Sequence, residues 1–122
     1  MTLLLPIDPS NDDNGATEIF ARSHRQGYLL AADGDYHELP LSQVDQTKGV
    51  RLCLEPGDVA VFHGILPHRS GANFSQTWQR QLYLSYNAHS DGGDQRDAHY
   101  RELQVWLKKE YAEFGKDAVY FK

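Results

Sequence analysis

Apolar and polar residues alternate in short runs over the first two-thirds of the chain, and this pattern predicts β-strands. We expect strands over residues 3–7, 17–21, 50–54 and 59–62, another beginning near His68, and a last one that carries Arg80 at its start. Turn clusters such as Asn14-Gly15 and Pro56-Gly57 separate the runs. The pattern therefore predicts a mainly β fold for residues 1–90.

A different period appears near the C-terminus. Large apolar side chains recur at helical spacing in this stretch: Tyr100, Leu103, Trp106, Leu107, Tyr111 and Phe114. Asp94 can cap the start of this helix, and Gly115 can end it. We expect one domain over residues 1–122, in which residues 91–122 form a C-terminal helix and a tail. The tail, with Val119-Tyr120-Phe121, is apolar enough to dock on the body or on a second chain.

Composition excludes several classes of function. The chain has 122 residues and a formal net charge of -5, with its basic residues scattered, which argues against binding nucleic acid or an anionic membrane. A single cysteine, Cys53, excludes an internal disulfide and a multi-cysteine zinc site. It lies in the alternating run 50–54, which indicates a buried, inert thiol. The apolar start is too short for a signal sequence or a membrane span, so we expect a cytoplasmic protein.

Three side chains with complementary chemistry fall on neighbouring predicted β elements: His68, Ser70 and Arg80. Neutral imidazole is a common ligand of divalent iron. A guanidinium gives a planar, bidentate grip on a carboxylate. If the three converge, they would form half of a site for a metal and a dicarboxylate.

The residues around this group resemble a known family. His68-x-Ser70-Gly71-x-Asn73-x-Ser75, followed by Arg80, resembles the distal half of the phytanoyl-CoA dioxygenase family. The earlier runs 12–16 and Ser23-His24-Arg25 resemble its Asn-Gly and Pro-Gly-Ser-His segments, in the same order. Members are non-haem Fe(II)/2-oxoglutarate oxygenases. The resemblance implies a partial double-stranded β-helix of the jelly-roll or cupin type, with one C-terminal α-helix.

The resemblance also implies roles for individual residues. His68 would be the distal Fe(II) ligand, and Arg80 with Ser70 would hold 2-oxoglutarate; no catalytic residue is assigned. The interval from His68 to Arg80 is one residue longer than usual in the family, which indicates a loop insertion around residues 76–79. The primary substrate would be a small molecule that the sequence does not identify.

This chain departs from the family pattern in two places. Ala21-Arg22 replaces the Pro-Gly of the family. The family's His-x-Asp pair, two of its three iron ligands, should precede the Asn-Gly segment, but Met1 lies only a few residues before it. We therefore expect a truncated half of an oxygenase, and whether it is an active enzyme stays open. Asp35 and His37 could offer a replacement pair, although a solvated loop is the favoured interpretation.

A second hypothesis is a metal-free β-helix module that serves binding or interaction and oligomerises through open strand edges. Uncovered edges present unpaired backbone groups that associate readily. Exchange of elements between chains would hide such edges. We expect a homo-oligomer for this reason.

Overall fold

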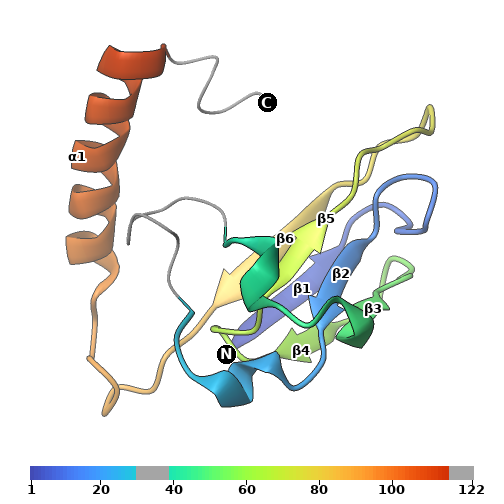
Figure 1. Ribbon diagram of the computed structural model, residues 1–122, viewed down its shortest axis with the longest axis horizontal. Helices are drawn as coiled ribbons and strands as arrows, with labels where there is room; N and C mark the ends of the chain where they lie inside the picture. The colour runs from blue at the N-terminus through green and yellow to red at the C-terminus, as the bar shows by residue number, and fades with distance from the viewer. Residues whose placement is uncertain (30–38, 116–122) are drawn as a thin grey trace. The chain divides into compact units, whose positions relative to one another are not determined.

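The computed structural model describes residues 1–29 and 39–115. The chain divides into two compact units, residues 1–86 and 87–122. The first unit holds all the strands, and the described part of the second holds one long helix (Figure 1). This confirms a mainly β protein with one C-terminal helix. The jelly-roll assignment and the number of domains stay predictions.

The first sheet has the strand order β4-β1-β6. It consists of β1 (Thr2–Pro6), β4 (Ala60–Phe62) and β6 (Gln81–Ser85), and both pairings are antiparallel. In β1 the residues at positions 2, 4 and 6 are buried and those between them are half-buried. Side chains alternate between the two faces of a strand, so one face of this sheet points into the unit.

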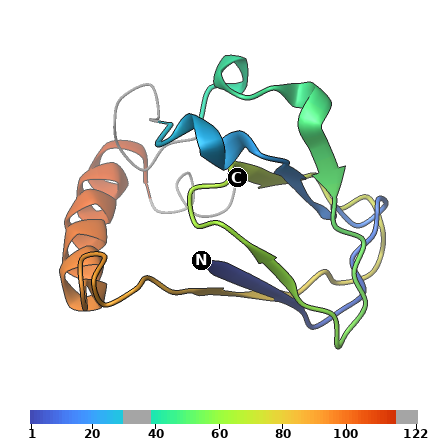
Figure 2. The ribbon, with the colours of Figure 1, turned by 90° about the horizontal axis from the view of Figure 1, so that it is seen from below.

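The second sheet has the strand order β3-β2-β5. It consists of β3 (Gly49–Arg51), β2 (Thr17–Phe20) and β5 (His68–Ser70), again antiparallel. The β2 register pairs Ile19 with His68 and Thr17 with Ser70, so these four side chains share one face. Figure 2 shows the two sheets as separate layers, seen along their planes.

A small core lies between the sheets. Leu4 is fully buried and forms a cluster with Phe62 and Leu66. Ile19, Leu54 and Ala60 pack against this cluster. Burial of each large apolar side chain stabilises the fold by about 1.5–3 kcal/mol.

The connections contain short 3₁₀ helices, η1 (Ser23–Gln26), η2 (Leu41–Gln43) and η3 (Gln46–Lys48). In the second unit, α1 runs from Arg96 to Phe114. The Asp94 carboxylate accepts a hydrogen bond from the Arg96 backbone N–H, at 3.3 Å. Gly115 ends the helix with φ near +80°, as expected of a residue without a Cβ.

Two details of the sequence interpretation need correction or lie outside the described residues. Cys53 is exposed, not buried, because regular pairing of β3 ends at Arg51. Asp35 and His37 lie in the segment 30–38, and the tail after residue 115 also falls outside the described residues. Among residues 1–29 and 39–115, no helix is both long and apolar enough to span a membrane.

Candidate functional site

His68 lies on the face of β5 that turns toward the first sheet, and the residue is exposed to solvent. Its Nδ1 lies 2.9 Å from the carbonyl oxygen of Leu66, two residues earlier. A carbonyl only accepts, so this contact assigns the proton to Nδ1 and leaves Nε2 with a free lone pair. The ring lies 5.9 Å from the Tyr83 ring and 5.5 Å from the Phe62 ring, centroid to centroid. A histidine held in this way is prepared to donate Nε2 to a metal.

Next to His68, four polar side chains form what we call the hydroxyl–amide cluster: Thr17, Ser70, Gln81 and Tyr83. The Thr17 hydroxyl is at its centre, 3.0 Å from the Tyr83 hydroxyl and 3.4 Å from that of Ser70. The Gln81 amide donates to the same oxygen at 3.1 Å. Because β2 and β5 belong to one sheet and β6 to the other, this cluster links the two sheets.

Burial in the hydroxyl–amide cluster is graded. Thr17 is 1% exposed, whereas Tyr83 is 40% exposed and Ser70 is also exposed. Thr17 therefore forms the floor of the cluster, and the hydroxyls of Ser70 and Tyr83 lie nearer to solvent. Several of the contacts are long, and hydroxyl groups both donate and accept, so the cluster has capacity for a further polar partner.

The Arg80 side chain points away from the hydroxyl–amide cluster and toward Asp8. Its Nε and Nη2 donate to the two carboxylate oxygens of Asp8 at 2.8 and 2.9 Å, and its backbone N–H donates to the same carboxylate at 2.8 Å. The Arg80 side chain is 62% exposed. The hydrogen bonds from Arg80 lower the pKa of Asp8 to about 2, so this carboxylate is charged at neutral pH.

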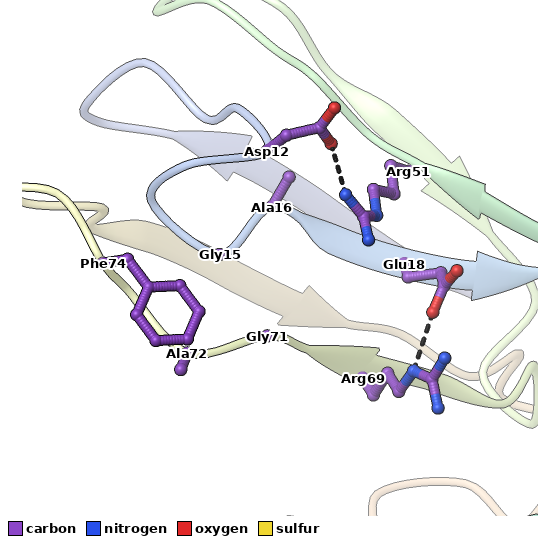
Figure 3. Close-up of a pocket in the computed structure, with 9 residues that line it drawn as sticks. All are labelled: Asp12, Gly15, Ala16, Glu18, Arg51, Arg69, Gly71, Ala72 and Phe74. Atoms are coloured by element: carbon purple, nitrogen blue, oxygen red, sulfur yellow. Dashed lines mark hydrogen bonds and ion pairs between the residues drawn. The ribbon is translucent and has the colours of Figure 1, made fainter.

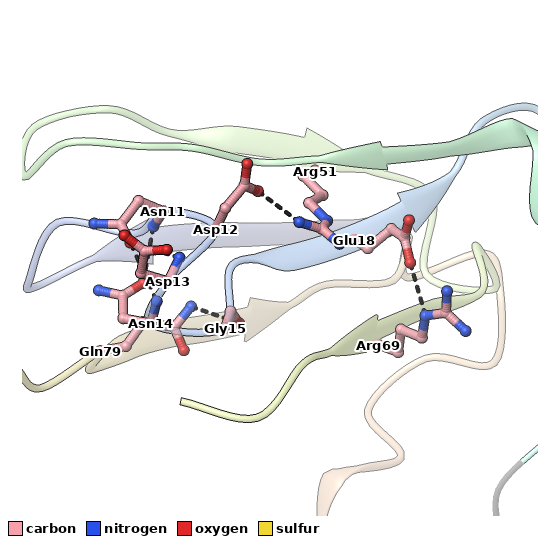
Figure 4. A network of polar contacts seen from close by, with 9 residues as sticks. All are labelled: Asn11, Asp12, Asp13, Asn14, Gly15, Glu18, Arg51, Arg69 and Gln79. Carbon is pink, nitrogen blue, oxygen red and sulfur yellow. Dashed lines mark hydrogen bonds and ion pairs between the residues drawn. The ribbon is translucent and has the colours of Figure 1, made fainter. Parts of the chain in front are cut away.

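The residue before Arg80 faces the interior instead. The Gln79 amide nitrogen donates to the Ser10 hydroxyl at 3.1 Å and to the Gly15 carbonyl oxygen at 3.0 Å. Figure 4 shows this side chain reaching the loop that ends at Gly15. That loop is organised by Asn14, whose side chain accepts from the Asn11 N–H and donates to the Pro9 carbonyl oxygen. Gln79 thus ties the start of β6 to the loop before β2.

Of the three residues predicted to converge, the structure places His68 and Ser70 on one face of β5, while Arg80 is bonded to Asp8 on another surface. A role of Arg80 in holding 2-oxoglutarate would require it to leave Asp8, and the roles of all three residues stay predictions. Sequence reasoning missed Thr17, Gln79, Gln81 and Tyr83. The alternation along β6 pointed to Gln81 and Tyr83, since both share a face.

Two further histidines among the described residues of this unit, His24 and His63, pair with each other. The rings of His24 and His63 stack on each other, with centroids 5.3 Å apart and planes 10° from parallel. Within residues 1–29 and 39–115, no group of three or more His, Cys, Asp or Glu side chains could hold a metal ion. His68 fits the role of one iron ligand, but the described residues do not form a three-ligand iron site.

A separate pocket of about 150 Å³ lies on the outer face of the second sheet (Figure 3). Two ion pairs line it: Arg51 with Asp12 at 2.9 Å and Arg69 with Glu18 at 2.7 Å. Phe74 closes one side. Its two cations are matched by two anions, and both pairs are partly exposed, so we interpret it as a solvated surface network.

The family model described as phytanoyl-CoA dioxygenase matches residues 1–81. This match covers most of the chain, including both sheets up to the first residue of β6. The chain belongs to the phytanoyl-CoA dioxygenase family. The resemblance inferred from the motifs is therefore confirmed, and family membership implies Fe(II) and 2-oxoglutarate as the usual cofactors.

Three curated relatives are similar to the chain. The methylphosphonate hydroxylase of Gimesia maris is 29% identical over 103 residues, which are 84% of this chain and 38% of the relative. The 2-aminoethylphosphonate dioxygenase of an uncultured bacterium, HF130_AEPn_1, is 28% identical over 80% of this chain and 36% of its own length. The dioxygenase lolE1 of Epichloe uncinata is 22% identical over 90% of this chain and 42% of its own length.

The chain therefore spans about two fifths of the length of these curated relatives. No solved structure matches it. The relatives and the family model agree on a dioxygenase of the phytanoyl-CoA dioxygenase family.

Proposed function

We propose that this chain supplies part of the active site of an Fe(II)- and 2-oxoglutarate-dependent hydroxylase, in which His68 is one of the iron ligands. The observation that carries the proposal is the contact from His68 Nδ1 to the Leu66 carbonyl oxygen, which leaves Nε2 free beside the hydroxyl–amide cluster. The family match supports the reaction class. When bound, the iron would supply the oxidising chemistry, and the protein would orient the substrate and exclude water.

A single imidazole does not make a selective iron site, because selectivity depends on the number and geometry of ligands. We infer that the remaining ligands come from a segment that carries the family's His-x-Asp pair, and that this chain alone is inactive. The primary substrate is a small molecule. Methylphosphonate and 2-aminoethylphosphonate are the first compounds to test, since two relatives are named for them.

Titration of the purified chain with Mn(II), a spectroscopically visible substitute for Fe(II), tests the role of His68. We expect weak binding that falls further in His68→Gln, because Nε2 is lost as a ligand. His89→Gln, in the second unit, is the matched control and should bind as the unchanged chain does. Equal affinity in His68→Gln and the unchanged chain would overturn the assignment.

The same titration also tests the metal-free alternative. A metal-free binding module predicts that Mn(II) broadens no signal of the His68 ring in an NMR spectrum. Selective broadening of this ring, with the other imidazoles unaffected, is expected if His68 belongs to a metal site. This readout does not require catalytic activity.

A further inference from the structure

The start of β6 turns a neutral side chain, and not a guanidinium, toward the space between the sheets. Gln79 and Gln81 both reach partners on or before β2, through Gly15 and Thr17 respectively. Arg80, between them, reaches Asp8 after the end of β1. This alternation is what an extended backbone requires, because successive side chains point to opposite faces.

Arg80 is also held firmly where it is. Both oxygens of Asp8 accept from its guanidinium, and the Arg80 backbone N–H adds a third hydrogen bond. Backbone bonds from Ile7 and Asp8 to the Arg80 carbonyl oxygen fix the same register. To face the interior, Arg80 would have to lose a bidentate ion pair and shift the strand by one residue, which would also turn Gln81 and Tyr83 outward.

Among the described strands, no inward position carries a cation in place of Arg80. The inward positions of the six described strands, read from their pairing, are occupied by Thr2, Leu4, Pro6, Thr17, Ile19, Val50, Phe62, His68, Ser70, Gln81, Tyr83 and Ser85, with Ala60 beside them. None of these is Lys or Arg. The family's co-substrate has two carboxylates, and a carboxylate that leaves water without a cationic partner is strongly disfavoured.

The chemistry of the hydroxyl–amide cluster favours a different ligand group. Hydroxyls donate and accept, and a glutamine amide offers both a donor and an acceptor. A carboxylate can use only the donors, whereas a primary amide can use donors and acceptors together. The cluster is therefore better matched to an uncharged amide or hydroxyl than to an anion.

We propose that the hydroxyl–amide cluster of this chain binds a 2-oxo acid whose far end is uncharged and polar, in preference to 2-oxoglutarate, and that Gln81, the inward side chain of β6 within the cluster, sets this preference. The proposal rests on the proposed function, since it concerns the co-substrate of the same site. It disagrees with the expectation that Arg80 and Ser70 hold the distal carboxylate of 2-oxoglutarate.

NMR titration of the ¹⁵N-labelled chain without metal tests this preference directly. The two probes are 2-oxoglutarate and its monoamide 2-oxoglutaramate, in which an amide replaces the distal carboxylate. We expect the side-chain amide signal of Gln81 to shift with the monoamide at an affinity about tenfold higher than with 2-oxoglutarate, a difference of about 1.4 kcal/mol, because the anion leaves the acceptors of the cluster unmatched. Ser70→Ala should weaken binding of the monoamide, because one hydroxyl of the cluster is lost.

Two single substitutions at adjacent positions provide the decisive contrast. Gln81→Arg places a positive charge within the cluster, so it should reverse the preference toward 2-oxoglutarate, as followed at the backbone signals of Thr17 and Ser70. Arg80→Gln removes the outward charge and should leave the preference unchanged. Tighter binding of 2-oxoglutarate by the unchanged chain, with loss of that binding in Arg80→Gln, would overturn the proposal, and so would no response to either probe. The Mn(II) titration involves no 2-oxo acid, so failure at His68 is distinguishable from failure here.

Discussion

The two sheets differ in what they turn outward. On the sheet β3-β2-β5 the outer side chains include Glu18, Arg51 and Arg69, which form ion pairs with each other or with Asp12. Phe20 shares this face, but it is buried beneath the Arg69 guanidinium. On the sheet β4-β1-β6 the outer side chains are Leu3, Leu5, Val61, Leu82 and Leu84. Val61, Leu82 and Leu84 are 59%, 50% and 40% exposed. One outer face thus presents mainly charged groups to water, and the other presents apolar ones.

This difference shows that the two sheets depend on the rest of the fold in different ways. Alternation of polar and apolar residues allows an antiparallel sheet to face water on one side, as the sheet β3-β2-β5 does. The sheet β4-β1-β6 has an apolar outer face in addition to the core residues Leu4 and Phe62 on its inner face, which is typical of a sheet covered by another layer. The expected homo-oligomer would cover this face or its edges, and it remains a proposal.

Leu4→Ala should cause the largest loss of stability, and it contrasts the inner face of the sheet β4-β1-β6 with the outer face. Leu4 is fully buried in the core, so its truncation should lower the free energy of unfolding by about 2–5 kcal/mol. Leu84→Ala, on the outer face of the same sheet, should cost less than about 1 kcal/mol. Urea denaturation of both variants measures the contrast. Equal losses would show that the outer face is covered as tightly as the core.

Gly15→Ala should have the next largest effect, at the junction between the loop before β2 and the turn after β5. Gly15 has φ near +86°, and an added Cβ would lie 2.5 Å from the Gly71 carbonyl oxygen. Gly27→Ala is the matched control, because Gly27 has φ near +83° and nothing within 4 Å of its added Cβ. Gly27 has ψ near -158°, in a region that essentially only glycine adopts, so both variants carry backbone strain of about 1–3 kcal/mol.

Only Gly15→Ala must also displace backbone of the second sheet. The loss of thermal stability in Gly15→Ala should therefore exceed that in Gly27→Ala. In an NMR spectrum of Gly15→Ala, the backbone amide signals of Thr17 and Ser70 should shift. If the two variants unfold at the same temperature, the close approach of Gly15 to Gly71 is not important for stability.

These contrasts separate what the sequence could predict from what it could not. Local alternation predicted the strands, and helical spacing with Gly115 predicted α1, because these signals lie within a few neighbouring residues. The orientation of Arg80 could not be predicted, since it depends on the pairing of Pro6 with Gln81, which are far apart in the chain. A shift of one residue would have brought Arg80 inward.

The hydroxyl–amide cluster was missed for the same physical reason. Thr17 is separated by more than 50 residues from each of its partners, and they meet only because the two sheets stack. The sequence predicted that His68 and Ser70 lie on a β element, and their spacing of two residues on β5 puts them on one face. Their roles in a site stay predictions, and contacts that cross the two sheets could not be read from the sequence.

The ion pair between Asp8 and Arg80 should give a smaller, pH-dependent effect. The pKa of Asp8 is lowered from 3.8 to about 2 in the folded chain, chiefly by the hydrogen bond from the Arg80 side chain. A lowered pKa means that the charged carboxylate stabilises the fold above the unfolded pKa, and that this contribution disappears as the pH falls through about 2. Asp8→Asn should therefore be less stable than the unchanged chain at pH 6.

That difference should shrink as the pH falls from about 4 to about 2. Asp45→Asn is a useful comparison, since the pKa of Asp45 is also lowered, by Thr47 and Lys48. Its side chain is more exposed than that of Asp8, 41% against 19%, and it joins no two strands. Thermal unfolding at a series of pH values measures the stability of both variants against the unchanged chain. A difference between Asp8→Asn and the unchanged chain that stays constant over this range would show that the pair has no role in acid sensitivity.

The smallest effect on stability should come from Leu84→Thr, which makes one exposed position of the apolar outer face polar. A surface change of this kind usually alters the free energy of unfolding by no more than about 0.5 kcal/mol. If a second copy covers this face, however, the substitution should weaken self-association, because the contact loses apolar area. Sedimentation over micromolar concentrations measures this association.

Arg51→Gln on the charged outer face is the matched control and should not change association. If both variants sediment as the unchanged chain does, the apolar face of β4-β1-β6 is not a contact between copies, and the difference between the two sheets reflects cover by another part of the protein.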